Sequence, residues 1–339
     1  MRVQFGNQDR YAGIGCVIPI GRRVARNHLE IRGGGSGERH LQRFAINGNN
    51  QTLGTVTNAG TITSTTGTPT LSIVSTSSGS GVYAGSLALF ANAVGGTVTL
   101  SGASTYSGNT TVNAGTLALS FSTAGAPTTN IINNTADTSP LIMSGFGTLT
   151  LTGKAGLTNS QQFPSLTLSA EAAPTIGLTG AATGSIALSL GTITRNAGAT
   201  LNFVAIPLTT GTTVTITGVT GNTGANGNDL SSGGILGTWV TGANSTYLQA
   251  NSSGQLVAYA GATAAAAPAN LTDTTGLVNY NLAAGSVTGL TSSFSMNTIR
   301  YTGAATGVLD IGTGASNSNT LTVNGIMGIR SKSQRHGMH

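Results

Sequence analysis

The sequence is poor in charged residues and in proline. Only 6% of its 339 residues are charged, against about 25% in an average soluble globular protein. Glycine supplies 51 positions, proline only eight. β-branched Thr and Val suit extended strands, whereas Gly and Asn suit tight turns. The composition therefore favours many short strands, gives little support to helix, and argues against a proline-rich linker.

Cysteine and histidine are almost absent. Cys16 is the only cysteine, so no intrachain disulfide can form. The histidines lie near the two ends, at His28, His40, His336 and His339. Residues 41–335 contain neither histidine nor cysteine. They therefore lack the residues needed for Ser-His-Asp or Cys-His catalysis and for an ordinary zinc site. We predict no catalytic residue, no cofactor and no metal site, and we expect His336 and His339 to be part of a solvated tail.

The net charge of +6 is concentrated at the ends of the chain. Eight Lys and Arg residues fall within residues 1–43 and three within 330–339. The body, residues 44–329, keeps three basic residues, Lys154, Arg195 and Arg300, against five acids: Asp137, Glu171, Asp229, Asp273 and Asp310. With a net charge of −2 the body offers no cationic groove for phosphates, so no nucleic-acid partner is expected. Because no run of 18 apolar residues occurs, no transmembrane segment is expected either.

Composition also marks candidate boundaries. Residues 1–43 form an atypical basic N-terminal segment and residues 330–339 a basic tail. We expect these ends to be disordered arms or the product of a misassigned reading frame. Residues 260–270 contain four consecutive alanines followed by Pro268, which predicts an Ala-rich linker between bodies at 44–259 and 271–329.

Within the body, apolar residues alternate with Thr, Ser or Ala. Leu149 and Leu151 alternate with threonines, and the same pattern occurs at Val98 and Leu100 and at Ile186 and Leu188. Each such stretch predicts a short strand with one apolar face.

The triplet Asn-Ala-Gly begins at Asn58, Asn113 and Asn196. The two intervals are close to two and three units of about 27–28 residues, within the range of solenoid repeats. A unit this short cannot shield its apolar face alone, but stacked coils bury a continuous core. We therefore predict an all-β fold, a parallel β-helix (β-solenoid) of about ten coils, over 44–259 and again over 271–329.

Residues 96–119 read GTVTLSGASTYSGNTTVNAGTLAL. This stretch resembles the autotransporter-associated β-strand repeat, also called the passenger-associated transport repeat, whose members typically read GTLTLSGxNTYTGxTTVxAGTL. Weaker echoes occur at 147–153 and 321–325. The resemblance implies a right-handed parallel β-helix that is extracellular or located at the bacterial outer-membrane surface.

Functionally, the resemblance implies a non-catalytic passenger protein, a stalk or an adhesin, with a host surface or extracellular glycans as partners. The apolar stretch at residues 16–20 is shorter than the roughly 7–15 residues that a signal peptide requires. The sequence also lacks the C-terminal series of alternating strands that would form a translocator barrel. We therefore expect the chain to be a fragment of a larger autotransporter-like protein.

Two other functions remain open. A β-helix enzyme that degrades polysaccharide would need two acids and a base in one groove. An ice- or glycan-binding solenoid would need threonine pairs in register on most consecutive coils.

Trp239 and Tyr247 could form a sugar-stacking platform, although such residues more often simply pack. Residues 224–230 approximate a calcium-binding nonapeptide, but a single copy is more simply a polar turn.

Overall fold

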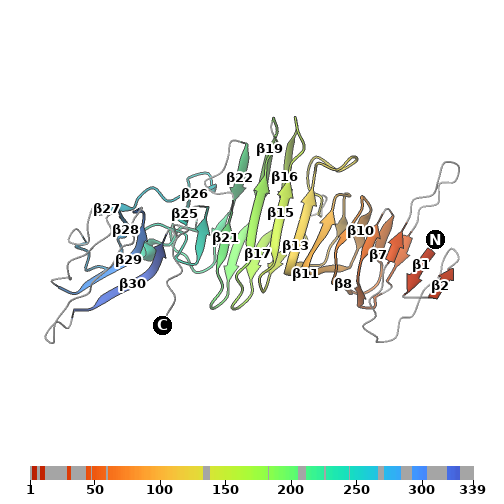
Figure 1. The fold of residues 1–339 in the computed structure, drawn as a ribbon, viewed down its shortest axis with the longest axis horizontal. Coiled ribbons are helices and arrows are strands. Elements are labelled where there is room, and N and C mark those ends of the chain that lie inside the picture. The colour runs from red at the N-terminus through yellow and green to blue at the C-terminus, as the bar shows by residue number, and fades with distance from the viewer. Residues whose placement is uncertain are drawn as a thin grey trace, which may run out of the picture.

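The computed structural model describes residues 2–5, 8–11, 29–31, 43–46, 48–58, 60–132, 138–181, 183–204, 211–224, 227–243, 245–265, 271–283, 292–303 and 319–328. These residues form an elongated all-β molecule without α-helix (Figure 1). One 3-10 turn, η2, spans Leu230–Ser232. No helix in the described part of the chain has the length and apolarity to cross a membrane.

The chain winds in coils whose parallel strands form three faces, which we call the first, second and third faces; β11 and β13 run through both the first and the second. The first face contains β5 (Gln51–Leu53), β8 (Thr70–Ile73), the first parts of β11 (Ala88–Leu100) and β13 (Thr110–Ser120), β14 (Leu141–Met143), β17 (Ser165–Leu168), β20 (Thr192–Arg195) and β23 (Gly218–Val219). The second face contains β3 (Leu29–Ile31), β6 (Val56–Asn58), β9 (Ser77–Ser78), the second parts of β11 and β13, β15 (Thr148–Thr152), β18 (Thr175–Thr179), β21 (Leu201–Phe203) and β24 (Val240–Gly242).

The third face contains two groups of parallel strands. The first group is β4 (Arg43–Ala45), β7 (Thr61–Ser64), β10 (Val82–Gly85) and β12 (Thr105–Tyr106). The second group is β16 (Thr158–Gln162), β19 (Ser185–Ser189) and β22 (Thr212–Thr215). Single parallel bridges at Ser104–Ile132 and Thr129–Ser160 link this face across residues 104–160. The chain thus visits the three faces in turn, which is consistent with a β-solenoid.

Inward-pointing side chains are stacked in columns from coil to coil. On the first face Val112, Met143 and Leu168 lie opposite one another and are fully buried. On the second face Leu117, Leu149 and Ile176 do the same. Because successive residues of a strand point to opposite faces of its sheet, the intervening Thr and Ser side chains point outward. The alternation seen in the sequence therefore sets the core, as predicted.

Coils differ in length more than the sequence predicts. Leu141, Leu166, Ile193 and Val219 lie in register on four successive coils, and their spacing along the chain is close to the predicted unit. Leu71, Leu89 and Thr110 also lie in register on successive coils, but they follow one another more closely along the chain. Shorter strands and shorter turns both contribute to the difference: β9 has two residues, whereas β15 has five.

Because the coils differ in length, the three Asn-Ala-Gly triplets do not all occupy the same corner of the stack. Asn113 and Asn196 each follow the first face at the same corner, three coils apart, in agreement with the prediction. Asn58 instead ends β6 on the second face. The interpretation of the first interval as two whole coils was therefore wrong, because the coils between Asn58 and Asn113 are shorter than the predicted unit.

The parallel stack ends in an antiparallel segment. β24 pairs in antiparallel fashion with β25 (Thr246–Ala250), which pairs in the same way with β26 (Leu256–Ala258). A change of strand direction prevents another parallel coil from continuing this sheet. Leu256 is the last residue of the large hydrophobic core.

A second, smaller core begins beyond this point. It lies under a parallel sheet of β27 (Thr263–Ala265), β28 (Asn279–Leu282), β29 (Phe294–Tyr301) and β30 (Leu321–Gly328). β27 falls within the predicted linker at 260–270, and its Ala265 is buried in this core. The rest of that linker, residues 266–270, and the basic tail, 330–339, lie outside the described residues.

Parts of the predicted atypical segment at 1–43 also form strands. β1 (Arg2–Phe5) and β2 (Gln8–Tyr11) form an antiparallel hairpin. β3 pairs in parallel with β6 and so belongs to the second face. His28, His40 and Cys16 lie outside the described residues.

Tyr106 lies at the centre of the segment that resembles the passenger repeat. Its side chain is fully buried, and its hydroxyl lies 2.7 Å from the Thr110 Oγ1 atom. The Thr110 hydroxyl in turn lies 3.0 Å from the Ser139 Oγ atom, which donates to the Gly108 carbonyl at 2.7 Å. This chain of hydroxyls satisfies the polar end of a side chain that otherwise fills the core. Burial raises the pKa of the Tyr106 phenol well above its ordinary value.

We expect Tyr106→Phe to lower the free energy of unfolding by about 1 kcal/mol at neutral pH, because one buried hydrogen bond is lost. The raised pKa means that folding favours the neutral phenol. This stabilisation is complete below the unfolded-state pKa of about 10 and is lost as pH rises above it. Urea unfolding at pH 8 and at pH 10.5 should show a smaller alkaline loss for the variant than for the unaltered chain. Equal alkaline losses would contradict the assignment.

Candidate binding cleft

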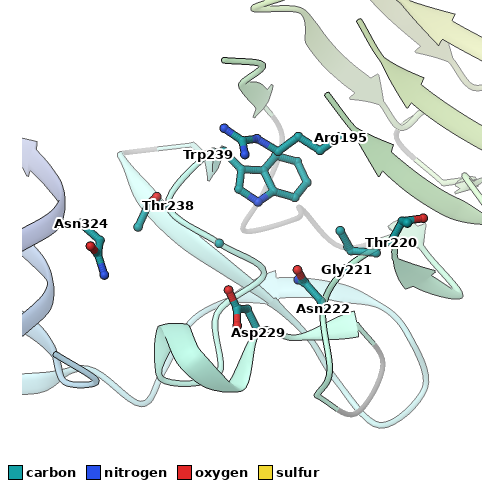
Figure 2. A pocket seen from close by; sticks show the side chains of 10 residues that line it. Arg195, Thr220, Gly221, Asn222, Asp229, Thr238, Trp239 and Asn324 are labelled. Carbon is teal, nitrogen blue, oxygen red and sulfur yellow. The ribbon is translucent and has the colours of Figure 1, made fainter. Parts of the chain in front are cut away.

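A polar cleft of about 460 Å³ opens where the parallel stack ends. Its walls come from the ends of β20 and β23, the turn after β23, the segments on either side of η2, and β30 of the second sheet. In Figure 2, Arg195 and Trp239 stand at the upper edge of the cleft, with Asp229 and Asn222 below them and Asn324 to one side. Residues far apart in the chain thus meet at one site.

Arg195 occupies a column that is apolar in the preceding coils. It lies opposite Leu168, which is buried, yet Arg195 itself is exposed. The reason is that β23 pairs only with Thr192 and Ile193, so no strand of the next coil lies opposite Arg195 in the described part of the chain. Its Nε atom donates to the Ala199 carbonyl at 2.8 Å. That bond fixes the side chain while using only one of the five guanidinium N–H donors.

Trp239 lies directly before β24 and is partly buried against the main core. Its carbonyl accepts a hydrogen bond of 2.9 Å from the Leu201 N–H, which fixes it to β21. The guanidinium carbon of Arg195 lies 5.6 Å from the centroid of the indole ring, a cation–π contact. Gly237 has a φ of +144°, and a Cβ there would lie 2.2 Å from the indole Nε1 atom. Only glycine therefore allows the indole to adopt this position.

Tyr247, the second aromatic residue of the suggested sugar platform, is only 5% exposed and is not among the residues that line the cleft. Burial raises the pKa of its phenol to about 12. Tyr247 therefore packs, whereas Trp239 contributes to the cleft.

The lower edge of the cleft is built from turns. The Asp229 carboxylate accepts hydrogen bonds from the Ser231 N–H at 2.9 Å and from the Ser231 hydroxyl at 2.6 Å, and so caps η2. The Asn222 Nδ2 group donates to the Gly227 and Leu236 carbonyls at 2.6 and 2.9 Å. Among the described residues of this turn, none donates a hydrogen bond to the Asn222 Oδ1 atom.

The predicted polar turn at 224–230 is in keeping with this geometry, although residues 225 and 226 lie outside the described residues. No group of three or more His, Cys, Asp or Glu side chains that could hold a metal occurs in the part of the chain that the structure describes. The single Asp229 carboxylate acts as a helix cap there.

A ladder of asparagines leads through the second sheet to the cleft. The Asn297 Nδ2 group donates to Asn279 Oδ1 at 2.7 Å, and Asn324 Nδ2 donates to Asn297 Oδ1 at 3.1 Å. Asn279 Nδ2 lies 3.4 Å from the Gly233 carbonyl, beside η2. Asn279 and Asn297 are buried, whereas Asn324 is exposed. In each step of the ladder the Nδ2 group donates one hydrogen bond toward Gly233, and Asn324 Oδ1 receives none from the described residues.

The remaining charged candidates are scattered or structural. Asp273 is buried; burial opposes its ionisation, but hydrogen bonds from the Thr275 hydroxyl and the N–H groups of Val278, Thr275 and Leu277 outweigh it and hold the pKa of this carboxyl below its ordinary value. It therefore stabilises the turn that leads into β28. Lys154, Glu171 and Arg300 do not line the cleft. Asp137, Asp310, His336 and His339 lie outside the described residues.

The outward side of the second face carries a column of threonines. Thr97, Thr116, Thr148 and Thr175 lie in register on four successive coils. The neighbouring column alternates between threonine and small residues: Thr99, Ala118, Thr150 and Gly177. Threonine pairs in register on consecutive coils, which an ice-binding face requires, are thus interrupted at every second coil.

Fold and cleft together define an all-β protein of stacked parallel coils with a polar, aromatic-containing cleft at the end of the stack. Residues 95–119 match the family model of the passenger-associated-transport-repeat. The match confirms the resemblance seen at 96–119 and covers the second part of β11 and all of β13 except its last residue. No curated protein matches the chain, and no solved structure matches it.

Proposed function

We propose that the chain is a non-catalytic passenger-type protein of the bacterial surface, whose stacked coils form an elongated stalk outside the outer membrane. The observation that carries this proposal is the passenger-associated repeat at 95–119. In the structure the strands of this segment pair in parallel with the coils on either side. The repeat is therefore an integral part of the stack.

We further propose that the coils wind in the right-handed sense. Crossovers between parallel strands of one sheet are right-handed in about 98% of cases, because right-twisted strands pack back onto the sheet most readily that way. Each coil here joins parallel neighbours on the same face.

A non-catalytic role is supported by the chemistry of the cleft. Among the described residues that line it, Asp229 is the only one with a carboxylate, and it caps η2. Hydrolysis of a glycosidic bond normally uses two carboxylates about 5–10 Å apart. The purified chain should release no reducing ends from a panel of polysaccharides. Release that disappears in Asp229→Asn would favour the enzyme alternative.

The surface location can be tested on intact cells of the organism that encodes the chain. Antibodies raised against the purified chain should label unpermeabilised cells, and external protease should remove the signal while a cytoplasmic marker stays intact. Labelling that appears only after permeabilisation would overturn the proposed location.

A further inference from the structure

We propose that the cleft formed by Arg195, Trp239, Asp229 and Asn324 binds an uncharged sugar unit of a glycan. The proposal goes beyond the stalk function and does not depend on it, because it rests on the cleft alone. At about 460 Å³ the cleft falls within the size range of small-molecule sites.

The charges of the cleft favour a neutral ligand. Among its described lining residues only Arg195 and Asp229 are charged, and they have opposite signs. An anionic ligand such as a uronate or a phosphate would be attracted by the guanidinium but repelled by the carboxylate. A hydroxyl group can donate to a carboxylate and accept from a guanidinium, so an uncharged polyol fits both.

Hydrogen-bonding groups of both kinds face the cleft. Donors are the four guanidinium N–H groups of Arg195 that do not bond to Ala199, together with the Thr238 hydroxyl. Acceptors are the Asn222 Oδ1 and Asn324 Oδ1 atoms, which receive no hydrogen bond from the part of the chain that the structure describes. A sugar hydroxyl acts as donor and acceptor at once, so it can pair with both sets.

Apolar surface lies beside these polar groups. Trp239 and Val219 line the cleft, and the indole is partly buried with Arg195 fixed against it. A sugar ring has apolar C–H surface between its hydroxyls, and such surface gains from contact with an aromatic ring. Many small-molecule sites are lined mainly by apolar side chains; this cleft is more polar, which suits a ligand that is itself covered with hydroxyl groups.

The site is also largely preorganised. The Trp239 indole is packed against the main core, the Arg195 side chain is hydrogen-bonded to Ala199, and the Asn324 side chain is hydrogen-bonded to Asn297. Fixing these side chains before binding reduces the entropy that a ligand would otherwise have to offset. Solvated side chains on an open strand would not be fixed in this way.

Trp239 is the only tryptophan of the chain, so its fluorescence reports on the cleft alone. The labelled full-length chain is first screened on an array of neutral and uronate-containing glycans. Neutral hits are then titrated while tryptophan emission is recorded. We expect saturable changes in emission with neutral oligosaccharides, with little dependence on NaCl between about 50 and about 500 mM, because no net charge is neutralised.

Variants separate the cleft from the rest of the chain. Arg195→Ala should weaken binding at least about tenfold, since charge-assisted hydrogen bonds are lost, and Arg195→Lys should restore only part of it because the planar fork is missing. Lys154→Ala, which changes a cation outside the cleft, should bind normally. Circular dichroism verifies that each variant is folded.

Three results would overturn the proposal: no neutral glycan bound on the array, saturable binding without a change in tryptophan emission, or equal weakening by Arg195→Ala and Lys154→Ala. A preference for uronates that is abolished by salt would also overturn it and would indicate an anion site. None of these outcomes affects the surface location, which the labelling of intact cells tests separately.

Discussion

Gly115→Ala is expected to lower the free energy of unfolding by about 2–5 kcal/mol, a large effect for a single methyl group. Gly115 lies inside β13 with a φ of +70°, where an L side chain is strained. A Cβ there would lie 1.8 Å from the Ala93 carbonyl oxygen on the preceding coil. Ala93 and Gly115 lie at the corner between two paired parts of β11 and β13, and the pairing on both sides limits how far either backbone can move away.

Gly125→Ala is the matched control. Its φ is +80°, almost the same as at Gly115, but no atom lies within 4 Å of the added Cβ. Only the conformational cost remains, about 1–2 kcal/mol. Urea unfolding followed by circular dichroism should therefore separate the two variants by about 1–3 kcal/mol. If both variants lost the same stability, close stacking of the coils at Gly115 would be refuted.

Leu149→Ala is expected to lower the free energy of unfolding by about 2–5 kcal/mol. Leu149 is fully buried on β15, between Leu117 on the preceding coil and Ile176 on the next. The two neighbours are held by parallel pairing on both sides, so they cannot close the cavity that the lost methyl groups would leave. Thermal unfolding should show a clearly lowered midpoint.

Thr150→Ala is the control on the same strand, at a side chain that points away from the core. Thr150 points outward and lies opposite Ala118 and Gly177, so its removal exposes no core. A surface change of this kind is expected to stay within about 0.5 kcal/mol. Comparable losses for Leu149→Ala and Thr150→Ala would contradict the assignment of one buried and one solvent-facing side to β15.

The sequence was sufficient to predict the inward columns. Strict alternation at Leu149 and Leu151, or at Val98 and Leu100, leaves one apolar side per strand, and only stacking can cover it. The passenger-like motif could be read for the same reason, because Tyr106, Gly108 and Gly115 occupy positions where one residue type fits. Local pattern and tertiary requirement coincide at these residues.

The prediction was weaker where coils differ in length. The triplet at Asn58 looks identical to those at Asn113 and Asn196, yet it lies at another corner. A triplet specifies a turn but does not specify which faces that turn connects. The antiparallel β24–β26 segment escaped prediction as well, because its strands have a composition similar to that of the parallel ones.

The cleft could not be found from the sequence alone. In the sequence, Arg195 is one of three isolated basic residues of the body. Trp239 is an aromatic residue in a weakly patterned region. Asn324 is distant from Arg195 in the chain, and it reaches the same site through the second sheet. Of the two aromatic residues that stood out, Trp239 lines the cleft and Tyr247 is buried.

The amino-acid sequence by itself thus determined an all-β chain of stacked coils, the side of each strand that is buried, and the passenger-associated repeat. These properties follow from spacing along the chain, since alternation acts over a few residues. The tertiary structure alone decided where the stack ends, which residues surround the opening and how the second sheet contributes to it. Those outcomes depend on coil lengths and on contacts between distant segments, for which local composition carries no signal.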